Sequence, residues 1–250
     1  MSERLSVLVL TEDTGDDAHD TISAVARKLL LLLEPGLDER RLYFERADKP
    51  ARAGMGFNCY KSGSPRDYGK KVLLAQAIAT HLLTDDVRTA VLVHVNGDRA
   101  WSARDPVDLC ENARRFNDEI LRRVEALLVA RSRSSALERL ALLVPFWSVE
   151  SWLFQNTSEA LRICEEHHPR YASAVPQFEA WSRSPATLDE QERPKRAVSF
   201  HDRYNLRLAQ GLPAGRLQRL GLSFAETLAR ADRPGLREVL TAISRHAGLA

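Results

Sequence analysis

Two short apolar runs that end in acidic residues constrain the fold more than any other feature of this sequence. The run at 6–11 is followed by Glu12. The run at 89–95 is followed by Asn96, a glycine and Asp98. Short runs rich in β-branched residues are typical of buried parallel strands, and open α/β sheets bind ligands at the carboxyl ends of such strands. We therefore expect Glu12 and Asp98 to meet at one edge of a sheet, where two carboxylates could hold a divalent cation.

Strand-like and helical patterns alternate through the first two thirds of the chain. Strands are expected at 6–11, 41–45, 89–95 and 140–145, and helices at 22–33, 72–83, 106–130, 148–153 and 157–166. Alternation of this kind produces parallel strands, because each helical crossover returns the chain to the same end of the sheet. The sequence predicts an α/β protein with a mostly parallel, four-stranded, Rossmann-like sheet and helices on both faces.

The pattern changes after residue 169 to helices and loops. Segment 182–196 is polar and turn-rich, and short helices are expected at 201–210, 217–231 and 236–246. A chain of 250 residues accommodates one α/β domain with a helical appendage. We therefore expect an α/β domain over 1–190 and a basic helical extension over 191–250.

Segment 46–71 is rich in glycine and lysine and shows no periodicity, so it is expected to be a long basic loop. It carries seven Lys and Arg residues against two Asp, with aromatic residues between them. Long loops are often functional, and basic and aromatic side chains together contact phosphates and stack on bases. Lys61, Lys70 and Lys71 are the candidate phosphate contacts. A solvated or disordered excursion is the alternative.

The net charge of +2 conceals an asymmetry between the two ends of the chain. Residues 1–45 carry five basic and ten acidic residues, whereas 193–250 carry eleven basic and four acidic residues. An acidic site beside a basic surface suits a cation-dependent enzyme that acts on a polyanion. Lys195, Arg196, Arg203 and Arg207 would form a basic helical face that contacts phosphates. Alternatively, this surface is solvated and pairs with acidic helices.

Several classes of protein find no support in the sequence. The longest apolar run is far shorter than the ~20 residues that span a bilayer, and no signal peptide precedes the first strand, so a cytoplasmic protein is expected. Three separated cysteines argue against a disulfide framework and a zinc knuckle. The chain lacks a P-loop, a dinucleotide-binding fingerprint in its proper setting and a GxSxG elbow.

The leading set of candidate catalytic residues is Glu12, Asp98 and Glu150, each at or near the end of an expected strand. Hard cations such as Mg²⁺ prefer oxygen ligands, and a bound ion can polarise a phosphoryl group and activate water. We assign metal ligation to Glu12 and Asp98, with support from Glu150 and from the amide oxygen of Asn96. The alternative is that the acidic residues after the first strand only stabilise the start of a helix.

The chain resembles the TOPRIM fold of topoisomerases, primases and phage-defence nucleases. Thr11-Glu12-Asp13 stands where that family has a glutamate after its first strand, and Asn96-Gly97-Asp98 stands where it has an acidic pair. Small stand-alone members have a Glu-x-Trp-Leu helix, which 149–153 (Val-Glu-Ser-Trp-Leu) matches. The resemblance covers about residues 5–165. It implies Mg²⁺- or Mn²⁺-dependent, nuclease-like hydrolysis of DNA or RNA, in bacterial defence or nucleic-acid processing.

Two departures from the family pattern keep other functions open. Asn96 replaces the first acid of the pair, and Asp13 replaces a glycine that often follows the glutamate. The alternative function is therefore a catalytically degenerate binding or regulatory component that acts with a partner ATPase. A third possibility is a phosphatase or nucleotide hydrolase for small phosphates.

Overall fold

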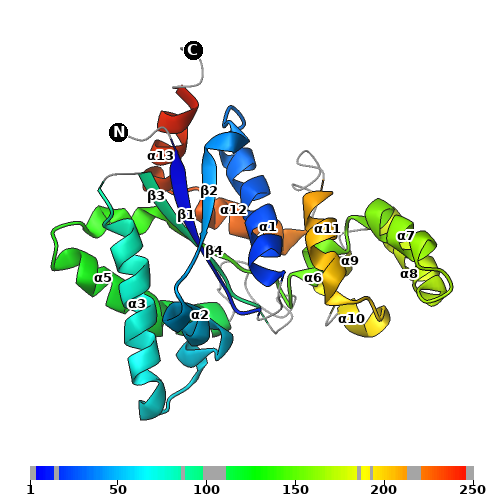
Figure 1. The fold of residues 1–250 in the computed structure, drawn as a ribbon, viewed down its shortest axis with the longest axis horizontal. Coiled ribbons are helices and arrows are strands. Elements are labelled where there is room, and N and C mark those ends of the chain that lie inside the picture. Colours follow the sequence, from blue (N-terminus) through cyan, green and yellow to red (C-terminus); the bar gives the residue numbers. More distant parts are fainter. Residues whose placement is uncertain are drawn as a thin grey trace.

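The fold is built around one parallel sheet of four strands (Figure 1). The computed structural model describes residues 4–13, 17–85, 88–97, 111–184, 187–191, 194–212 and 221–245. The strands are β1 (Leu5–Thr11), β2 (Leu42–Arg46), β3 (Arg88–His94) and β4 (Leu140–Leu143), in the order β2-β1-β3-β4. The predicted α/β, Rossmann-like class is confirmed, with the strands close to the expected positions.

The register brings the carboxyl ends of the two central strands level with each other. Leu5 of β1 pairs with Arg88 of β3, and the pairing continues to Thr11 and His94. Because the strands are parallel and in step, the residues that follow Thr11 and His94 leave the sheet side by side.

Helices cover both faces of the sheet. The helices of the first half are α1 (Ala18–Leu33), α2 (Lys49–Gly56), α3 (Tyr68–Leu82), α4 (Glu111–Phe116) and α5 (Arg122–Val129). Those of the second half are α6 (Glu150–Leu153), α7 (Thr157–Glu166), α8 (Val175–Arg183), α9 (Thr187–Glu190), α10 (Pro194–Ala197), α11 (Asn205–Gln210), α12 (Leu222–Ala231) and α13 (Pro234–Arg245). Figure 1 shows α2, α3 and α5 on one side of the sheet and α1 and α12 on the other.

The alternation of side chains along β1 divides the core into two layers. Val7 and Val9 pack in the core that contains α1 and the C-terminal helices. Leu8 and Leu10 pack in the core under α2, α3 and α5. Successive residues of a strand point to opposite faces, so a strand that is apolar throughout requires helices on both sides.

The expectation that 46–71 is one long loop is wrong. The segment contains α2, two short 3₁₀ turns at Cys59–Lys61 and Pro65–Asp67, and the beginning of α3. Asp48 caps α2, because its carboxylate accepts a hydrogen bond from the backbone N–H of Ala51 at 2.9 Å. Met55 is fully buried against the α3 side of the core. The predicted helix at 106–130 is observed from residue 111, with a π-helical turn at Asn117–Leu121, and 106–110 lie outside the described residues.

The expected C-terminal helical extension is present and shares the core of the sheet. Phe200, Leu208, Phe224 and Leu240 are buried in the same cluster as Val7 of β1. Apolar residues from both sides of residue 190 pack together in this cluster. The division of the chain at residue 190 stays a prediction. None of the described helices is long and apolar enough to cross a membrane.

Candidate functional site

The two acid-tipped motifs meet at the carboxyl edge of the sheet. The backbone N–H of Asn96 donates a hydrogen bond to Oε2 of Glu12 at 2.9 Å. The Glu12 side chain is only 4% exposed, so this contact lies in the protein rather than on its surface. Asp98 lies outside the described residues. The adjacency of β1 and β3 therefore joins Glu12 to the backbone of the second motif.

A small polar cluster surrounds this contact. Nδ1 of His94 lies 3.0 Å from Oγ1 of Thr11 and 3.6 Å from Oδ2 of Asp13. The side-chain nitrogen Nδ2 of Asn96 approaches Oδ1 of Asp13 at 3.5 Å, which is at the limit of a hydrogen bond. His94 is completely buried in β3, as a hydrogen-bonded core histidine would be. The cluster places the side chains of Asp13 and Asn96 together.

Gly97 fixes the position of the second motif. Its N–H donates to the carbonyl oxygen of Pro145 at 3.1 Å. A Cβ at this position would lie 1.8 Å from the carbonyl oxygen of Phe146, a separation that no real contact allows. The chain after β3 therefore lies directly against the backbone after β4, and the glycine of Asn-Gly-Asp is required by this close approach.

Lys61 lies against Glu12 instead of standing free on a loop. Its ammonium group is 3.3 Å from Oε1 of Glu12, and its side chain is 24% exposed. A predicted phosphate contact thus balances the charge of a predicted metal ligand. Asn112 also belongs to the site, because its amide donates to the carbonyl oxygen of Asn96 at 2.9 Å. No local pattern in the sequence marks Asn112.

Glu150 is paired in a similar way. It begins α6 and is almost fully buried, and Lys195 contacts its Oε1 at 2.9 Å. Asn205 donates to the same oxygen at 3.1 Å, and Lys195 also pairs with Asp202 at 2.6 Å. Burial favours the neutral amine of Lys195, but the two carboxylates outweigh this effect and raise its pKa above the usual value. No sequence pattern connects Asn205 and Asp202 with Glu150, because they are remote from it along the chain.

A pocket of about 440 Å³ connects Glu150 with the acidic segment after β1. Its lining includes Asp13 and Asp17 together with Glu150, Lys195 and Asn205. Glu150 therefore shares a pocket with Asp13, whereas Glu12 contacts Asn96 and Lys61. The three predicted acids do not form one described triad, since Asp98 is outside the described residues.

The remaining predicted phosphate contacts differ in their surroundings. Lys70 pairs with Asp67 at 2.8 Å and stays partly exposed. Lys71 is buried and donates to Glu119 at 2.9 Å and to the carbonyl oxygen of Ser62 at 2.8 Å. This ion pair leaves the Lys71 ammonium little surface for a phosphate, and we do not retain Lys71 among the phosphate contacts. Arg196 is exposed on α10.

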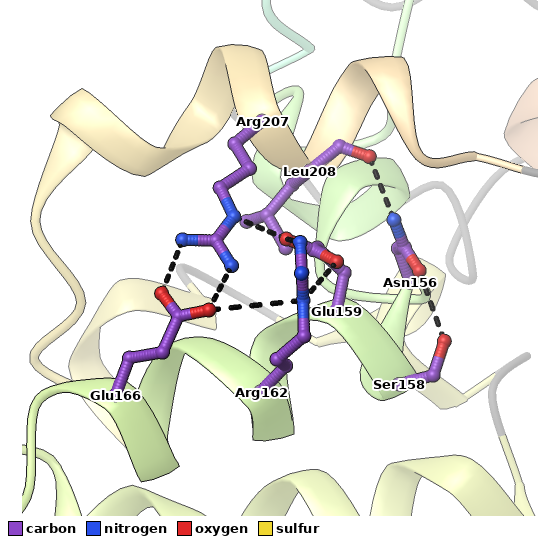
Figure 2. Close-up of polar contacts among 7 residues, drawn as sticks. All are labelled: Asn156, Ser158, Glu159, Arg162, Glu166, Arg207 and Leu208. Atoms are coloured by element: carbon purple, nitrogen blue, oxygen red, sulfur yellow. Dashed lines mark hydrogen bonds and ion pairs between the residues drawn. The ribbon is translucent and has the colours of Figure 1, made fainter.

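Arg207 does not contribute to the basic face that was expected around it. Figure 2 shows its guanidinium group between two carboxylates of α7. It donates to Glu166 at 2.6 and 2.7 Å and also contacts Glu159, which pairs with Arg162 at 2.8 Å. The hydrogen bonds from Arg207 lower the pKa of Glu166 below its usual value. Arg207 therefore attaches α11 to α7 and is not available to a polyanion.

Within the described residues, no group of three or more His, Cys, Asp and Glu side chains is arranged to hold a metal ion. Two further candidate ligands are not covered by this statement. Asn96 has an amide side chain, and Asp98 lies outside the described residues.

The fold and the edge cluster define an α/β protein with a Rossmann-like parallel sheet and a polar cluster at its carboxyl edge. No protein-family model, curated protein or solved structure matches this chain.

Proposed function

We propose that this chain is a divalent-cation-dependent phosphodiesterase that hydrolyses nucleic acid at the carboxyl edge of its sheet. One observation carries the proposal: adjacent parallel strands bring Glu12, Asp13 and Asn96 together, with a hydrogen bond of 2.9 Å between Glu12 and the Asn96 backbone. Oxygen donors at the carboxyl ends of parallel strands are the common setting of ligand sites in open α/β sheets. A resemblance to TOPRIM nucleases points in the same direction and favours a role in bacterial defence or nucleic-acid processing.

The donor set is chemically suited to Mg²⁺ or Mn²⁺. Oδ1 of Asn96 is buried, and no hydrogen-bond donor reaches it from the residues that the structure describes. Buried polar atoms normally have a partner, and an amide oxygen is a suitable ligand for a hard cation. Mg²⁺ commonly takes one or two protein carboxylates and keeps several waters. Asp13 and Asn96 would hold the ion, together with the predicted ligands Glu12 and Asp98.

Such an ion, when bound, polarises a phosphoryl oxygen and makes its bound water more acidic. The protein residues have separate tasks. Glu12 holds the Asn96 backbone and, through Lys61, keeps a partly exposed ammonium group at the edge, where it can contact a phosphate. The excess of basic residues after residue 193, with Arg196 exposed among them, attracts a polyanion.

The second candidate is a binding or regulatory component that acts with a partner ATPase. It is favoured by the two lysines that already neutralise acidic residues of the site, Lys61 on Glu12 and Lys195 on Glu150. A lysine ammonium supplies the charge that a metal ion would otherwise provide, and Asn96 adds no charge of its own. In this case nucleic acid would bind without being cut.

Substitution of Glu12 separates the two candidates. We expect Glu12→Gln to reduce Mn²⁺-dependent cleavage of DNA or RNA by at least about 100-fold, because general acid–base and metal-activation effects have that size. We expect the free energy of unfolding to fall by about 1–2 kcal/mol, because Lys61 loses a largely buried partner. Cleavage of labelled single- and double-stranded DNA and RNA, and urea unfolding, measure the two effects.

Glu125→Gln is the matched control, since Glu125 is an exposed residue of α5. Calorimetric titration of Mn²⁺ completes the test. Metal binding together with cleavage that EDTA abolishes supports the hydrolase. Equal cleavage by the wild type and Glu12→Gln would remove Glu12 from the active site. Nucleic-acid binding with neither metal binding nor cleavage would select the second candidate.

A further inference from the structure

A second pocket, of about 400 Å³, lies at the carboxyl end of β1 on the side of α2. Val9, Ala18, Ala53 and Gly56 contribute small or apolar surface to its lining. Its volume is within the range of small-molecule sites. Asp13 lines both this pocket and the pocket of Glu150, so both adjoin the candidate metal cluster.

Three basic side chains line this second pocket, and their charges are poorly balanced. Arg46, Lys49 and Arg52 are all exposed. Among the described residues, neither Lys49 nor Arg52 forms an ion pair or a side-chain hydrogen bond. Arg46 has one distant carboxylate, Asp20, at 3.7 Å. Cations that the protein leaves without counter-charges beside a concave site favour an anionic ligand such as a phosphate.

The pocket also offers groups that suit a nucleobase. Phe57 lines it and is 69% exposed, and the Lys70 ammonium lies 4.7 Å from the centre of its ring. Exposed aromatic rings beside cations are the platforms on which unpaired bases stack. His19 lies in the wall, where its Nε2 is buried without a hydrogen-bond partner in the part of the chain that the structure describes. Phe57 and the adjacent Lys70 therefore give the pocket a surface on which a base can stack.

We propose that this pocket binds one unpaired nucleotide of the substrate, with its base beside Phe57 and its phosphate facing Arg46, Lys49 and Arg52. The identity of the ligand rests on the proposed function, because Asp13 would bring the bound nucleotide next to the metal cluster. A base that is paired in a duplex cannot enter a pocket of this size. The substrate is therefore single-stranded nucleic acid, or an unpaired end of a strand.

Binding measured in EDTA tests the pocket without requiring cleavage. A fluorescein-labelled 12-nucleotide single strand and its duplex are titrated with the full chain, and anisotropy is followed. We expect the single strand to bind at least about 10-fold more tightly than the duplex. Phe57→Ala and Arg52→Glu should each weaken single-strand binding by about 10-fold, as expected for loss of one stacking platform and reversal of one charge.

Arg131→Glu is the control for the charge change. Arg131 is exposed in the turn between α5 and the segment that leads into β4, and it does not line the pocket. We expect this variant to retain at least half of the wild-type affinity. Circular dichroism checks that all the variants are folded, which is expected because Phe57 and Arg52 are surface residues.

Wild-type affinity in both pocket variants, or equal affinity for the duplex, would overturn the proposal. The outcomes also separate this inference from the proposed function. Single-strand binding that depends on Phe57 and Arg52 but is not followed by cleavage in Mn²⁺ would leave the pocket in place and reject the hydrolase. If the wild type cleaves nucleic acid but Phe57→Ala and Arg52→Glu bind the single strand with wild-type affinity, the hydrolase is supported and the pocket proposal is rejected.

Discussion

At the scale of single residues, the candidate site depends on how closely two backbones approach. Gly97 lies against the carbonyl groups of Pro145 and Phe146, and its N–H donates to one of them. Asn96 immediately precedes this contact. Its backbone N–H donates a hydrogen bond to Glu12, and its side chain supplies the buried Oδ1. The position of the potential ligands is thus set by a residue that has no side chain.

We expect Gly97→Ala to lower the free energy of unfolding by at least about 2 kcal/mol, because backbone atoms on both sides must move to admit a Cβ. Cleavage should be lost as well, since Asn96 would shift away from Glu12. Urea denaturation followed by circular dichroism measures the stability. Gly63→Ala is the control, because nothing lies within 4 Å of a Cβ at Gly63. A change of equal size in the two variants would contradict this explanation.

The contacts of the site could be predicted from the sequence only in part. The two apolar runs predict that Glu12 and Asp98 meet at one edge, because adjacent parallel strands end there. The structure shows Glu12 in contact with the backbone of Asn96, two residues before Asp98, which lies outside the described residues. The pairing of Lys61 with Glu12 could not be predicted, since it depends on the path of the chain through α2. The burial of Lys71 could not be predicted either, because tertiary packing decides whether a lysine is buried.

At the scale of elements, α11 is attached to α7 by charge. Arg207 of α11 donates to Glu159 and Glu166 of α7, as Figure 2 shows. Hydrogen bonds from Arg162 and Arg207 lower the pKa of Glu159, and that from Arg207 lowers the pKa of Glu166. The folded state then binds fewer protons than the unfolded chain near pH 4, so stability falls as the pH is lowered.

The sign of this linkage predicts how Arg207→Ala behaves. The contribution of Glu159 and Glu166 to the free energy of unfolding is fully present above their usual pKa of 4.5. It is lost as the pH falls through their lowered pKa values in the folded protein. We expect the variant to lower Tm by about 3 °C at pH 7 and by a smaller amount at pH 3, below the usual pKa of the two carboxylates. Thermal unfolding at several pH values measures the difference.

Arg122→Ala is the control for this measurement, because it removes an exposed ion pair within a single helix, with Asp118 at 2.8 Å. Pairs of this kind contribute little, so Tm should change by less than about 1 °C at either pH. A difference between the wild type and Arg207→Ala that stays constant from pH 7 to pH 3 would mean that Arg207 acts through packing and not through the two carboxylates.

Elements differ in how strongly the sequence specifies them. The four strands were predicted because each is a short apolar run that must be buried on both faces. Helix α2 was missed because Lys49–Gly56 contains a proline and two glycines, which usually disfavour helices. Its stability comes from the Asp48 cap and from burial of Met55, and the second of these is a tertiary effect.

At the scale of the whole molecule, the sheet and the C-terminal helices form one core. The carboxylate of Asp189 accepts a hydrogen bond from the backbone N–H of Ser223 at 2.7 Å. The hydroxyl group of Ser223 accepts one from the indole of Trp152 at 2.8 Å. These buried contacts connect α6 and α9 with α12 across residue 190. A polar network of this kind loses its partners if either side is removed, and unsatisfied buried groups are costly.

A chain that ends at residue 190 is therefore expected to lose cooperative folding. It would lack several large side chains that are fully buried in the core of the sheet, Leu208, Phe224, Leu236, Leu240 and Ile243. Burial of each contributes about 1.5–3 kcal/mol, and a few of them equal the whole stability of a typical domain, about 5–15 kcal/mol. Calorimetry should show no unfolding transition for 1–190, whereas a chain that ends at residue 245 keeps every described residue and should unfold like the full chain. A cooperative transition of 1–190 would instead establish residue 190 as a domain boundary. The C-terminal helices would then be an appendage that packs on a sheet domain able to fold without them.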